Sequence, residues 1–234
     1  MLASLSYAEK LELLELEEEK ARRIHYNQFE SWFPDAGPLR RELYPKHMAF
    51  FAAGIEHRER LFMAGNRVGK TIAGGYEMVC HLTGIYPHWW VGRRFDKAVV
   101  ALAAGDTSAT TRDILQNKLL GPFDDIGSGM IPKKLISGDP VRRQGIAEAY
   151  EEVRVKHVSG DISRLMLRSY EQGRKIFQGF ELDIAWLDEE VPEDVYGEAL
   201  IRTMTTSGLM MMTFTPLQGL TPLVVDFMES AGLL

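Results

Sequence analysis

The chain has 234 residues, of which 45% are apolar and 26% charged, and its formal net charge is −6. These values are ordinary for a globular protein and argue against a uniformly basic nucleic-acid coat, although screening beyond about 10 Å leaves room for a local basic patch. No apolar run reaches the length of a membrane span, the acidic N-terminus is unlike a secretory signal, and the single cysteine, Cys80, excludes a disulfide framework, so we expect a cytosolic protein.

The first expected element is one long helix over residues 6–31. Ser6 and Glu9 match a capping box, and acidic residues precede basic ones, which suits the helix dipole. This helix either packs by one narrow face and is otherwise solvated, or binds a partner. Prolines and a glycine over residues 34–38 end it and form a linker.

From about Leu61 onward, apolar strands alternate with helices. The expected strands are 61–64, 98–104, 153–158, 165–169, 182–187 and 209–214, and the expected helices are 71–82, 110–120 and 193–204. Gly84 is expected to end the first of these helices. Residues 121–150 show no clean period and predict a loop with one short helix at most. The alternation favours an α/β fold with a mainly parallel sheet, divided into a helical extension and linker at 1–38 and one domain at 39–234.

The strongest motif lies between the first strand and the helix that follows it. Its residues are Ala64-Gly65-Asn66-Arg67-Val68-Gly69-Lys70-Thr71, a phosphate loop with alanine at the usual first glycine. The two glycines let backbone N–H groups face an anion. Lys70 would reach the β- and γ-phosphates, Thr71 would offer its hydroxyl to Mg²⁺, and Ile72 belongs to the expected nucleotide contacts. The helix also points its positive end at the phosphates, so the motif predicts a site for Mg-ATP.

A second motif ends the strand at 182–187. Asp188 and Glu189 follow it directly, at the edge of a parallel sheet where ligands bind. We expect Asp188 to hold Mg²⁺, directly or through water, and Glu189 to orient and deprotonate the attacking water. Many strands end in an acidic turn, but after a phosphate loop in the same domain the pair predicts an ATPase.

Several stretches of the sequence carry a family resemblance. They are Leu43-Tyr44-Pro45-Lys46, residues 62–71, Leu82-Thr83-Gly84-Ile85-Tyr86-Pro87-His88-Trp89-Trp90, Ser169-Tyr170-Glu171-Gln172-Gly173-Arg174, Leu187-Asp188-Glu189-Glu190 and Met212-Thr213-Phe214-Thr215-Pro216. In these the chain resembles the large terminase subunits that package DNA into tailed-phage capsids, over most of residues 43–228. The Tyr-Glu-Gln-Gly-Arg and Thr-Phe-Thr-Pro stretches are more specific than the phosphate loop.

The resemblance implies a RecA-like P-loop ATPase that uses ATP and Mg²⁺ to move double-stranded DNA into a phage procapsid. It implies the portal protein and the small terminase subunit as partners, a ring of five subunits, and a location in the host cytoplasm, transiently at the portal vertex. The family normally adds a nuclease domain with clustered carboxylates; after Pro216 only Asp226 and Glu229 remain, so we expect that domain to be absent. The alternative is a helicase-like or remodelling P-loop ATPase, which needs a second such domain or a partner that supplies one.

The resemblance also implies two further groups of site residues. Thr213-Phe214-Thr215 looks like the coupling motif, which senses the γ-phosphate and relays hydrolysis to DNA movement; otherwise it is simply a buried strand end. Tyr44 and His47 resemble the segment that holds adenine. Many relatives have glutamine where His47 stands, so the imidazole either stacks on the base or donates one hydrogen bond, or it is a plain surface histidine.

Arginines that stabilise the developing charge in phosphoryl transfer are expected at three positions. Arg67 lies in the phosphate loop, three residues before Lys70 rather than four as in many relatives. Where relatives often carry an arginine before a glycine, this chain has Gln178-Gly179. Arg174 or Arg202 would then act on a neighbouring subunit, or they form ion pairs.

Those ion pairs would join Arg174 to Glu171 or Glu181 and Arg202 to Glu198. Two basic pairs, Lys133-Lys134 and Arg142-Arg143, lie in the irregular segment. They either contact DNA phosphates or simply solvate the loop.

Overall fold

The structure, a computed structural model, describes residues 6–233 of the chain. Its helical elements are α1 (Tyr7–His25), η2 (Gln28–Ser31), η3 (Arg41–Leu43), α2 (Pro45–Ala52), η4 (Ala53–Ile55), α3 (Lys70–Thr83), α4 (Ser108–Thr110), η5 (Thr111–Gln116), α5 (Asn117–Leu120), η6 (Lys133–Leu135), η7 (Tyr170–Gln172), η8 (Arg174–Phe177), α6 (Glu193–Met204) and α7 (Pro222–Ser230). Its strands are β1 (Glu59–Met63), β2 (Val100–Gly105), β3 (Val141–Arg142), β4 (Tyr150–Lys156), β5 (Ile162–Ser169), β6 (Ile184–Asp188) and β7 (Leu209–Phe214).

All of these strands form one sheet in the order β1-β7-β6-β2-β5-β4-β3. Neighbours from β1 to β5 pair in parallel, while β4 and β3 extend the sheet with antiparallel pairs. The prediction of an α/β fold with a mainly parallel sheet and an N-terminal helix is confirmed. Because the parallel strands all end at one edge, the loops that follow β1, β6 and β7 meet there.

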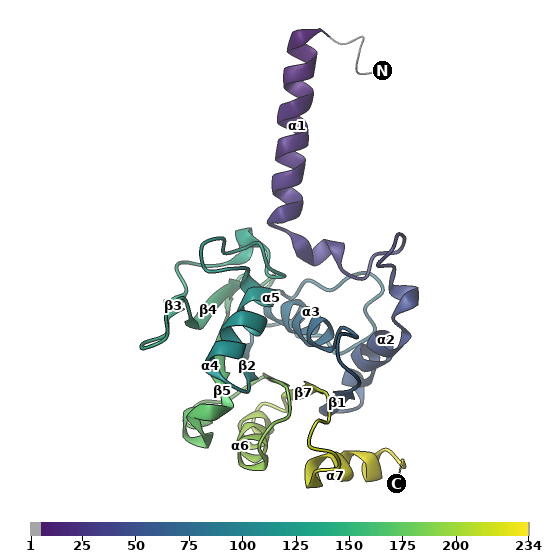
Figure 1. The fold of residues 1–234 in the computed structure, drawn as a ribbon, viewed down its shortest axis with the longest axis vertical. Helices are drawn as coiled ribbons and strands as arrows, with labels where there is room; N and C mark the ends of the chain where they lie inside the picture. Colours follow the sequence, from purple (N-terminus) through teal and green to yellow (C-terminus); the bar gives the residue numbers. More distant parts are fainter. Residues whose placement is uncertain (1–5, 234) are drawn as a thin grey trace.

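Helices cover both faces of the sheet (Figure 1). Side chains alternate along a strand, so Ile184 and Trp186 of β6 join the core cluster that includes α2, α3 and α5, whereas Ala185 and Leu187 join the cluster that includes α6 and α7. All four side chains are fully buried. The central strands are therefore apolar on both faces, which explains their continuous apolar runs.

Helix α1 stands away from the rest of the chain (Figure 1) and buries none of its residues. The Ser6–Glu9 capping box is confirmed. The predicted end at residue 31 is wrong, because α1 ends at His25 and a 3-10 turn follows. The chain turns there so that Phe29 enters the core and stacks on Tyr76, with ring centroids 4.7 Å apart. Tertiary packing thus ends a helix that local propensity would continue.

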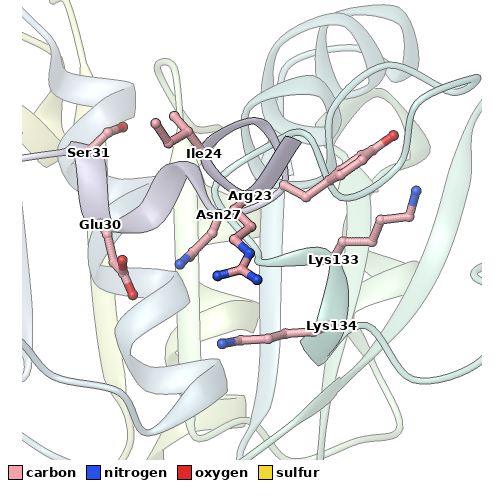
Figure 2. A pocket seen from close by; sticks show the side chains of 8 residues that line it. Arg23, Ile24, Asn27, Glu30, Ser31, Lys133 and Lys134 are labelled. Carbon is pink, nitrogen blue, oxygen red and sulfur yellow. The ribbon is translucent and has the colours of Figure 1, made fainter. Parts of the chain in front are cut away.

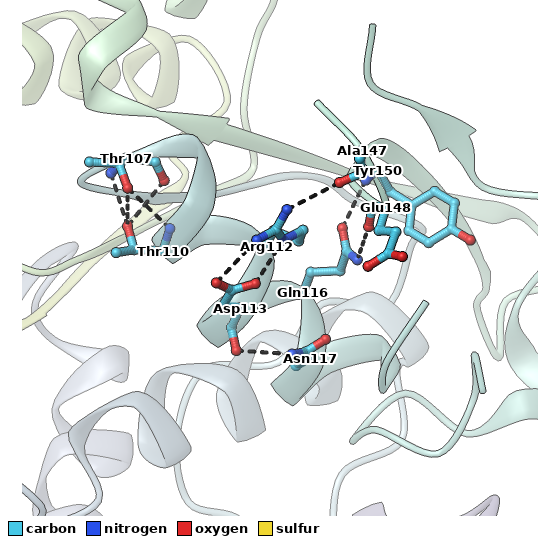
Figure 3. A network of polar contacts seen from close by, with 9 residues as sticks. All are labelled: Thr107, Thr110, Arg112, Asp113, Gln116, Asn117, Ala147, Glu148 and Tyr150. Atoms are coloured by element: carbon cyan, nitrogen blue, oxygen red, sulfur yellow. Dashed lines mark hydrogen bonds and ion pairs between the residues drawn. The ribbon is translucent and has the colours of Figure 1, made fainter. Parts of the chain in front are cut away.

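The helix predicted at 110–120 contains a π-helical stretch, η5. Gln116 at its end is buried, and its side chain binds two backbone groups of the returning loop (Figure 3). Its Nε2 donates to the Glu148 carbonyl at 2.9 Å, and its Oε1 accepts from the Tyr150 N–H at 2.8 Å. The irregular segment before β4 is therefore fastened to η5, although it contains only η6 and β3 as regular structure.

Several predicted bounds agree closely with the structure. Helix α6 and strand β7 have the predicted limits, and Gly84 ends α3 with a left-handed φ of 70°. Helices α2 and α7 were not predicted. Cys80 is fully buried and Trp90 nearly so, and both side chains pack in the core. Among residues 6–233, no helix has both the length and the apolar character needed to cross a membrane.

Candidate active site

The phosphate loop connects β1 to α3, and a buried ion pair joins those two elements beside it. Arg60 of β1 donates to Glu77 of α3 at 2.6 Å, and both side chains are buried. Gly69 has a φ of 86°, and a Cβ there would lie 3.0 Å from the His47 ring nitrogen. Arg67 is exposed and adopts a φ of 61°, an uncommon conformation for a residue with a side chain. The loop backbone therefore depends on a glycine at position 69.

Lys70 lies at the first turn of α3 with its ammonium group held inside the loop. Its Nζ donates to the Gly65 carbonyl at 2.7 Å and to the Thr215 hydroxyl at 2.9 Å. The Thr215 hydroxyl is also 2.8 Å from Asn66 Oδ1. Thr215 follows β7, so the lysine is in contact with two strand ends at once.

Asp188 ends β6 and is 2% exposed. The Thr71 hydroxyl lies 3.3 Å and 3.2 Å from its two carboxylate oxygens, and the Thr213 hydroxyl donates to Oδ1 at 2.5 Å. Burial raises the pKa of Asp188 to about 7, against the lowering effect of the Thr213 hydrogen bond. The two sequence motifs, far apart in the chain, thus meet at one edge of the sheet.

Glu189 follows with a φ of 67° and is half-buried. Its backbone N–H donates to the Thr213 carbonyl at 3.0 Å, which holds the residue in this left-handed conformation. Such conformations cost on the order of 1–2 kcal/mol in a residue with a side chain and concentrate at functional sites. The local strain indicates that the Glu189 backbone is held in a fixed position beside the site, and it does not favour an ordinary acidic surface turn.

Strand β7 lies between the strands that carry the two motifs. In its register, Thr213 is opposite Asp188 and Phe214 is opposite Met63 at the end of β1. Thr213 and Phe214 are buried, as the simpler interpretation of a buried strand end also requires. The hydroxyl groups at this end nevertheless contact Asp188 and Lys70, so the structure brings Thr213 and Thr215 to the candidate site.

Tyr170 is a site residue that the sequence reasoning did not assign. Its hydroxyl lies 2.8 Å from the Asp188 carbonyl and 3.1 Å from the Ala104 carbonyl, and burial raises its pKa well above the ordinary value. Glu171 accepts from the Ser108 N–H at 2.8 Å and so caps α4. The signal was available, because Tyr170 and Glu171 begin the Tyr-Glu-Gln-Gly-Arg stretch.

An aromatic cavity of about 260 Å³ adjoins the phosphate loop. It is lined by Trp32, Phe33, Leu39, Tyr44, His47, Arg67, Val68, Gly69 and Ile72. His47 is 6% exposed, and its Nε2 lies 3.2 Å from the Gly69 carbonyl, so the interpretation as a surface histidine is wrong. Burial lowers its pKa, which favours the neutral ring.

A larger cavity, of about 730 Å³, lies at the base of α1 and shares no residue with the phosphate loop (Figure 2). Its lining includes Arg23, Lys133 and Lys134, and the Lys133 ammonium lies 3.9 Å from the centre of the Tyr26 ring. The other basic pair is held elsewhere. Arg142 lies over the Phe123 ring, 5.1 Å from its centre, and Arg143 donates to Ser169 at 3.4 Å.

One of the predicted arginines, Arg202, lies away from the phosphate loop of its own chain. Arg202 donates to Glu198 at 2.9 Å, and its carbonyl accepts from the Leu182 N–H at 2.9 Å. Leu182 precedes β6, so Arg202 lies at the opposite end of this strand from Asp188. Arg174 is exposed. The pKa of Glu198 is lowered first by hydrogen bonds from Arg202 and Gln178, with a smaller contribution from the Arg174 charge.

The oxygen donors at the site suit Mg²⁺. Across the described residues, no group of three or more histidine, cysteine, aspartate or glutamate side chains is placed to hold a metal ion. Mg²⁺ bound with a nucleotide needs fewer, because one or two protein oxygens, substrate phosphates and water complete its octahedron. The Thr71 hydroxyl and Asp188 carboxylate form such a pair.

The family described as "Terminase large subunit, T4likevirus-type, N-terminal" matches residues 61–232. A large terminase subunit of Salmonella phage P22 is 34% identical over 251 residues, which cover 98% of this chain and 48% of that protein; the chain thus spans about half the length of that relative. Two structures of the large terminase from a thermophilic bacteriophage, one of them in complex with ADP, have TM-scores of 0.48 and 0.46 at 14% identity. Each covers 80% of this chain, which spans 37% of that protein.

Proposed function

The chain belongs to the phage terminase large subunits, in the N-terminal region of their T4-like type, and we propose that it hydrolyses Mg-ATP to drive double-stranded DNA into a phage procapsid. The observation that carries the proposal is the meeting of the phosphate loop with the acidic strand end. Thr71 lies within 3.3 Å of both carboxylate oxygens of Asp188. A hydroxyl at the start of a phosphate-loop helix beside a buried carboxylate is the arrangement that binds Mg²⁺ with nucleotide phosphates.

Each residue of the site has a proposed role that follows from its chemistry. Lys70 binds the β- and γ-phosphates, and Thr71 and Asp188 hold Mg²⁺, which neutralises charge on those phosphates. Glu189 orients the attacking water and takes its proton. The charge that develops in phosphoryl transfer is met either by Arg67, exposed in the phosphate loop, acting on the ATP bound to its own chain, or by Arg174 or Arg202 of a neighbouring subunit.

The aromatic cavity beside the loop is the proposed adenine site. It adjoins Gly69 and is lined by Tyr44 and His47, and its volume of about 260 Å³ has room for a purine base. His47 is held against the Gly69 carbonyl. A neutral, fixed imidazole suits stacking on the base or a single hydrogen bond.

Strand β7 is the proposed coupling element. The Thr215 hydroxyl binds Lys70 and the Thr213 hydroxyl binds Asp188, so the ammonium and the carboxylate that meet the substrate both hydrogen-bond to the same strand end. A change in the contacts of either group on hydrolysis therefore acts directly on Thr213-Phe214-Thr215. This arrangement supports a role in relaying hydrolysis to movement.

The partners follow from the family and are part of the proposal. They are double-stranded DNA, the portal protein, the small terminase subunit and further copies of this chain in a ring. The place of action is the host cytoplasm, at the portal vertex of the procapsid. Stimulation of ATP hydrolysis by double-stranded DNA or by self-assembly is the measurement that tests this part.

The first test concerns Lys70. Lys70→Ala should abolish ATP hydrolysis and weaken Mg-ATP binding, because it removes the cation of the phosphate loop. Lys118→Ala, which removes an exposed lysine of α5, is the matched control and should hydrolyse ATP like the parent. Phosphate release by Lys70→Ala at the parent rate would show that the site lies elsewhere.

The second test separates the two carboxylates. Glu189→Gln should retain Mg-ATP binding and lose about 10²–10⁴-fold in turnover, the usual contribution of a positioned base. Asp188→Asn should instead lose the Mg²⁺ dependence of nucleotide binding. Glu190→Gln is the control, because Glu190 accepts from the Gln218 N–H. If Glu190→Gln lost turnover and Glu189→Gln did not, the catalytic base would be Glu190 and our assignment would be wrong.

A further inference from the structure

Trp186 is a fully buried side chain that lies two residues before Asp188 on β6. Both residues therefore point to the face of the sheet that α3 covers, and Trp186 belongs to the core cluster on that face. Its indole Nε1, although buried, has a polar partner. It donates to the Thr213 hydroxyl on the neighbouring strand at 2.7 Å.

The direction of the hydrogen bonds follows from the chemistry of the three groups. An indole N–H donates and never accepts, and a threonine hydroxyl has one hydrogen. Because Trp186 occupies a lone pair of the Thr213 oxygen, the single Thr213 hydrogen is free to point at Asp188, 2.5 Å away. The chain Trp186–Thr213–Asp188 thus has one polarity, and each member is at most 2% exposed, so water does not compete for these bonds.

Helix α3 is shaped to receive this indole. A Cβ at Gly74 would lie 2.4 Å from the indole nitrogen, and one at Gly75 would lie 3.6 Å from the ring. Glycine inside a helix costs about 1 kcal/mol relative to alanine, so two in succession call for a packing reason. The helix that begins with Lys70 and Thr71 rests on Trp186 through these glycines.

We propose that Trp186 is a positioning residue of the nucleotide site: its N–H orients the Thr213 hydroxyl, and that hydroxyl fixes the carboxylate of Asp188 for Mg²⁺. The inference rests on the proposed ATPase function. Through Gly74 on one side and Thr213 on the other, the indole also connects the phosphate-loop helix to β7. The alternative is that Trp186 only packs in the core. A packing role would not depend on its N–H group.

The test compares nucleotide binding with and without metal in the whole 234-residue chain. Trp186→Phe keeps an aromatic ring and removes the N–H. Affinity for ADP with Mg²⁺ should fall about two- to tenfold, the value of one hydrogen bond, while affinity for ADP in EDTA should stay within about twofold. Trp90→Phe is the matched control, because the Trp90 N–H also donates in a nearly buried site, to the Arg93 carbonyl at 3.0 Å. That variant should keep the parent's Mg²⁺ dependence.

A double-mutant cycle adds a readout that pure packing does not move. Thr213→Val removes the hydroxyl at constant shape and should reduce Mg²⁺-dependent affinity by at least as much as Trp186→Phe. The double variant should be no weaker than Thr213→Val, since the indole acts only through that hydroxyl. In the parent, Mg-ADP should also shift the indole N–H resonance that is missing in Trp186→Phe, and Thr213→Val should remove that shift.

The outcomes separate the inference from the function on which it rests. Parent-like Mg²⁺ dependence in a folded Trp186→Phe protein would overturn the role of Trp186 and leave the ATPase proposal standing. Additive losses in the double variant, or an indole resonance that ignores Mg-ADP, would do the same. A parent chain that binds no nucleotide at all would overturn both.

Discussion

At the scale of single residues, Asp188 combines burial with a role that requires charge. Its carboxylate is almost inaccessible, and burial raises its pKa from 3.8 to about 7, although hydroxyls from Thr71 and Thr213 partly offset the effect. Near neutral pH the group is therefore poised between its two forms. Mg²⁺ and the Lys70 charge would favour the ionised form when a nucleotide binds.

This shift predicts a pH dependence of stability for the chain without metal or nucleotide. A carboxyl whose folded pKa exceeds its unfolded value stabilises the fold fully below about pH 4, and the contribution disappears as pH rises through about 7. Asp188→Asn cannot ionise. Its free energy of unfolding relative to the parent should therefore rise by about 3 kcal/mol between pH 5 and pH 8, because the two pH units from 5 to the folded pKa each contribute about 1.4 kcal/mol. Denaturant melts in EDTA measure this, and a pH-independent difference would contradict it.

At the scale of elements, α3 is positioned by two glycines that bring its backbone close to the sheet. Because Gly74 and Gly75 have no side chains, the Trp186 ring of β6 packs directly against the helix at these two residues. On the other side of the loop, the buried Arg60–Glu77 pair holds α3 to β1. The helix that carries Lys70 and Thr71 is thus held to the strands on both sides of β7, and the loop geometry depends on these contacts.

The packing of α3 predicts opposite effects of one substitution at two helical glycines. Gly74→Ala should destabilise the fold by about 1–3 kcal/mol, because its Cβ would meet the indole at 2.4 Å and overpack the core. Gly197→Ala in α6 is the matched control. Nothing lies within 4 Å of a Cβ there, so this variant should be more stable by up to about 1 kcal/mol. Thermal and denaturant melts compare the two variants. Stabilisation by Gly74→Ala would contradict the close packing of Gly74 against the Trp186 indole.

At the scale of the whole molecule, the positions of the arginines bear on assembly. Arg202 lies at the far end of β6 from Asp188, paired with Glu198. The strand spans roughly 15 Å at about 3.3 Å per residue, so this guanidinium does not reach the phosphate loop of its own chain. Its expected action on phosphate therefore requires a neighbouring subunit, and Arg174, which is exposed near the same glutamate, is the other donor to test.

A mixing experiment tests action between subunits. Glu189→Gln subunits keep both arginines, whereas Arg174→Ala or Arg202→Ala subunits keep the base. Neither variant alone should hydrolyse ATP well, and an assembled mixture should recover part of the activity, because an arginine at the developing charge contributes about 10³–10⁵-fold.

The control for the loss of the ion pair is Glu198→Gln, which removes the negative charge opposite Arg202 and retains the arginine. It should keep the activity that Arg202→Ala loses. No recovery with either arginine variant, in conditions where the parent assembles, would leave Arg67 acting within its own chain as the better account.

Local sequence determined the elements and the motifs of this protein. The phosphate loop, the acidic strand end, the limits of α6 and β7 and the glycine that ends α3 follow from spacing, periodicity and turn chemistry, which act over a few residues. Family resemblance added the Thr-Phe-Thr stretch. These features sufficed for the α/β fold and for a prediction of Mg-ATP chemistry.

The tertiary structure alone decided how those pieces meet. Strand order is set by packing between segments far apart in the chain, and no local period reports it. Only the insertion of β7 between β1 and β6 brings Thr215 to Lys70 and Thr213 to Asp188. The same long-range packing buries His47 against Gly69 and ends α1 at His25. A single sequence records which residues prefer burial, and the folded chain determines which partners they find there.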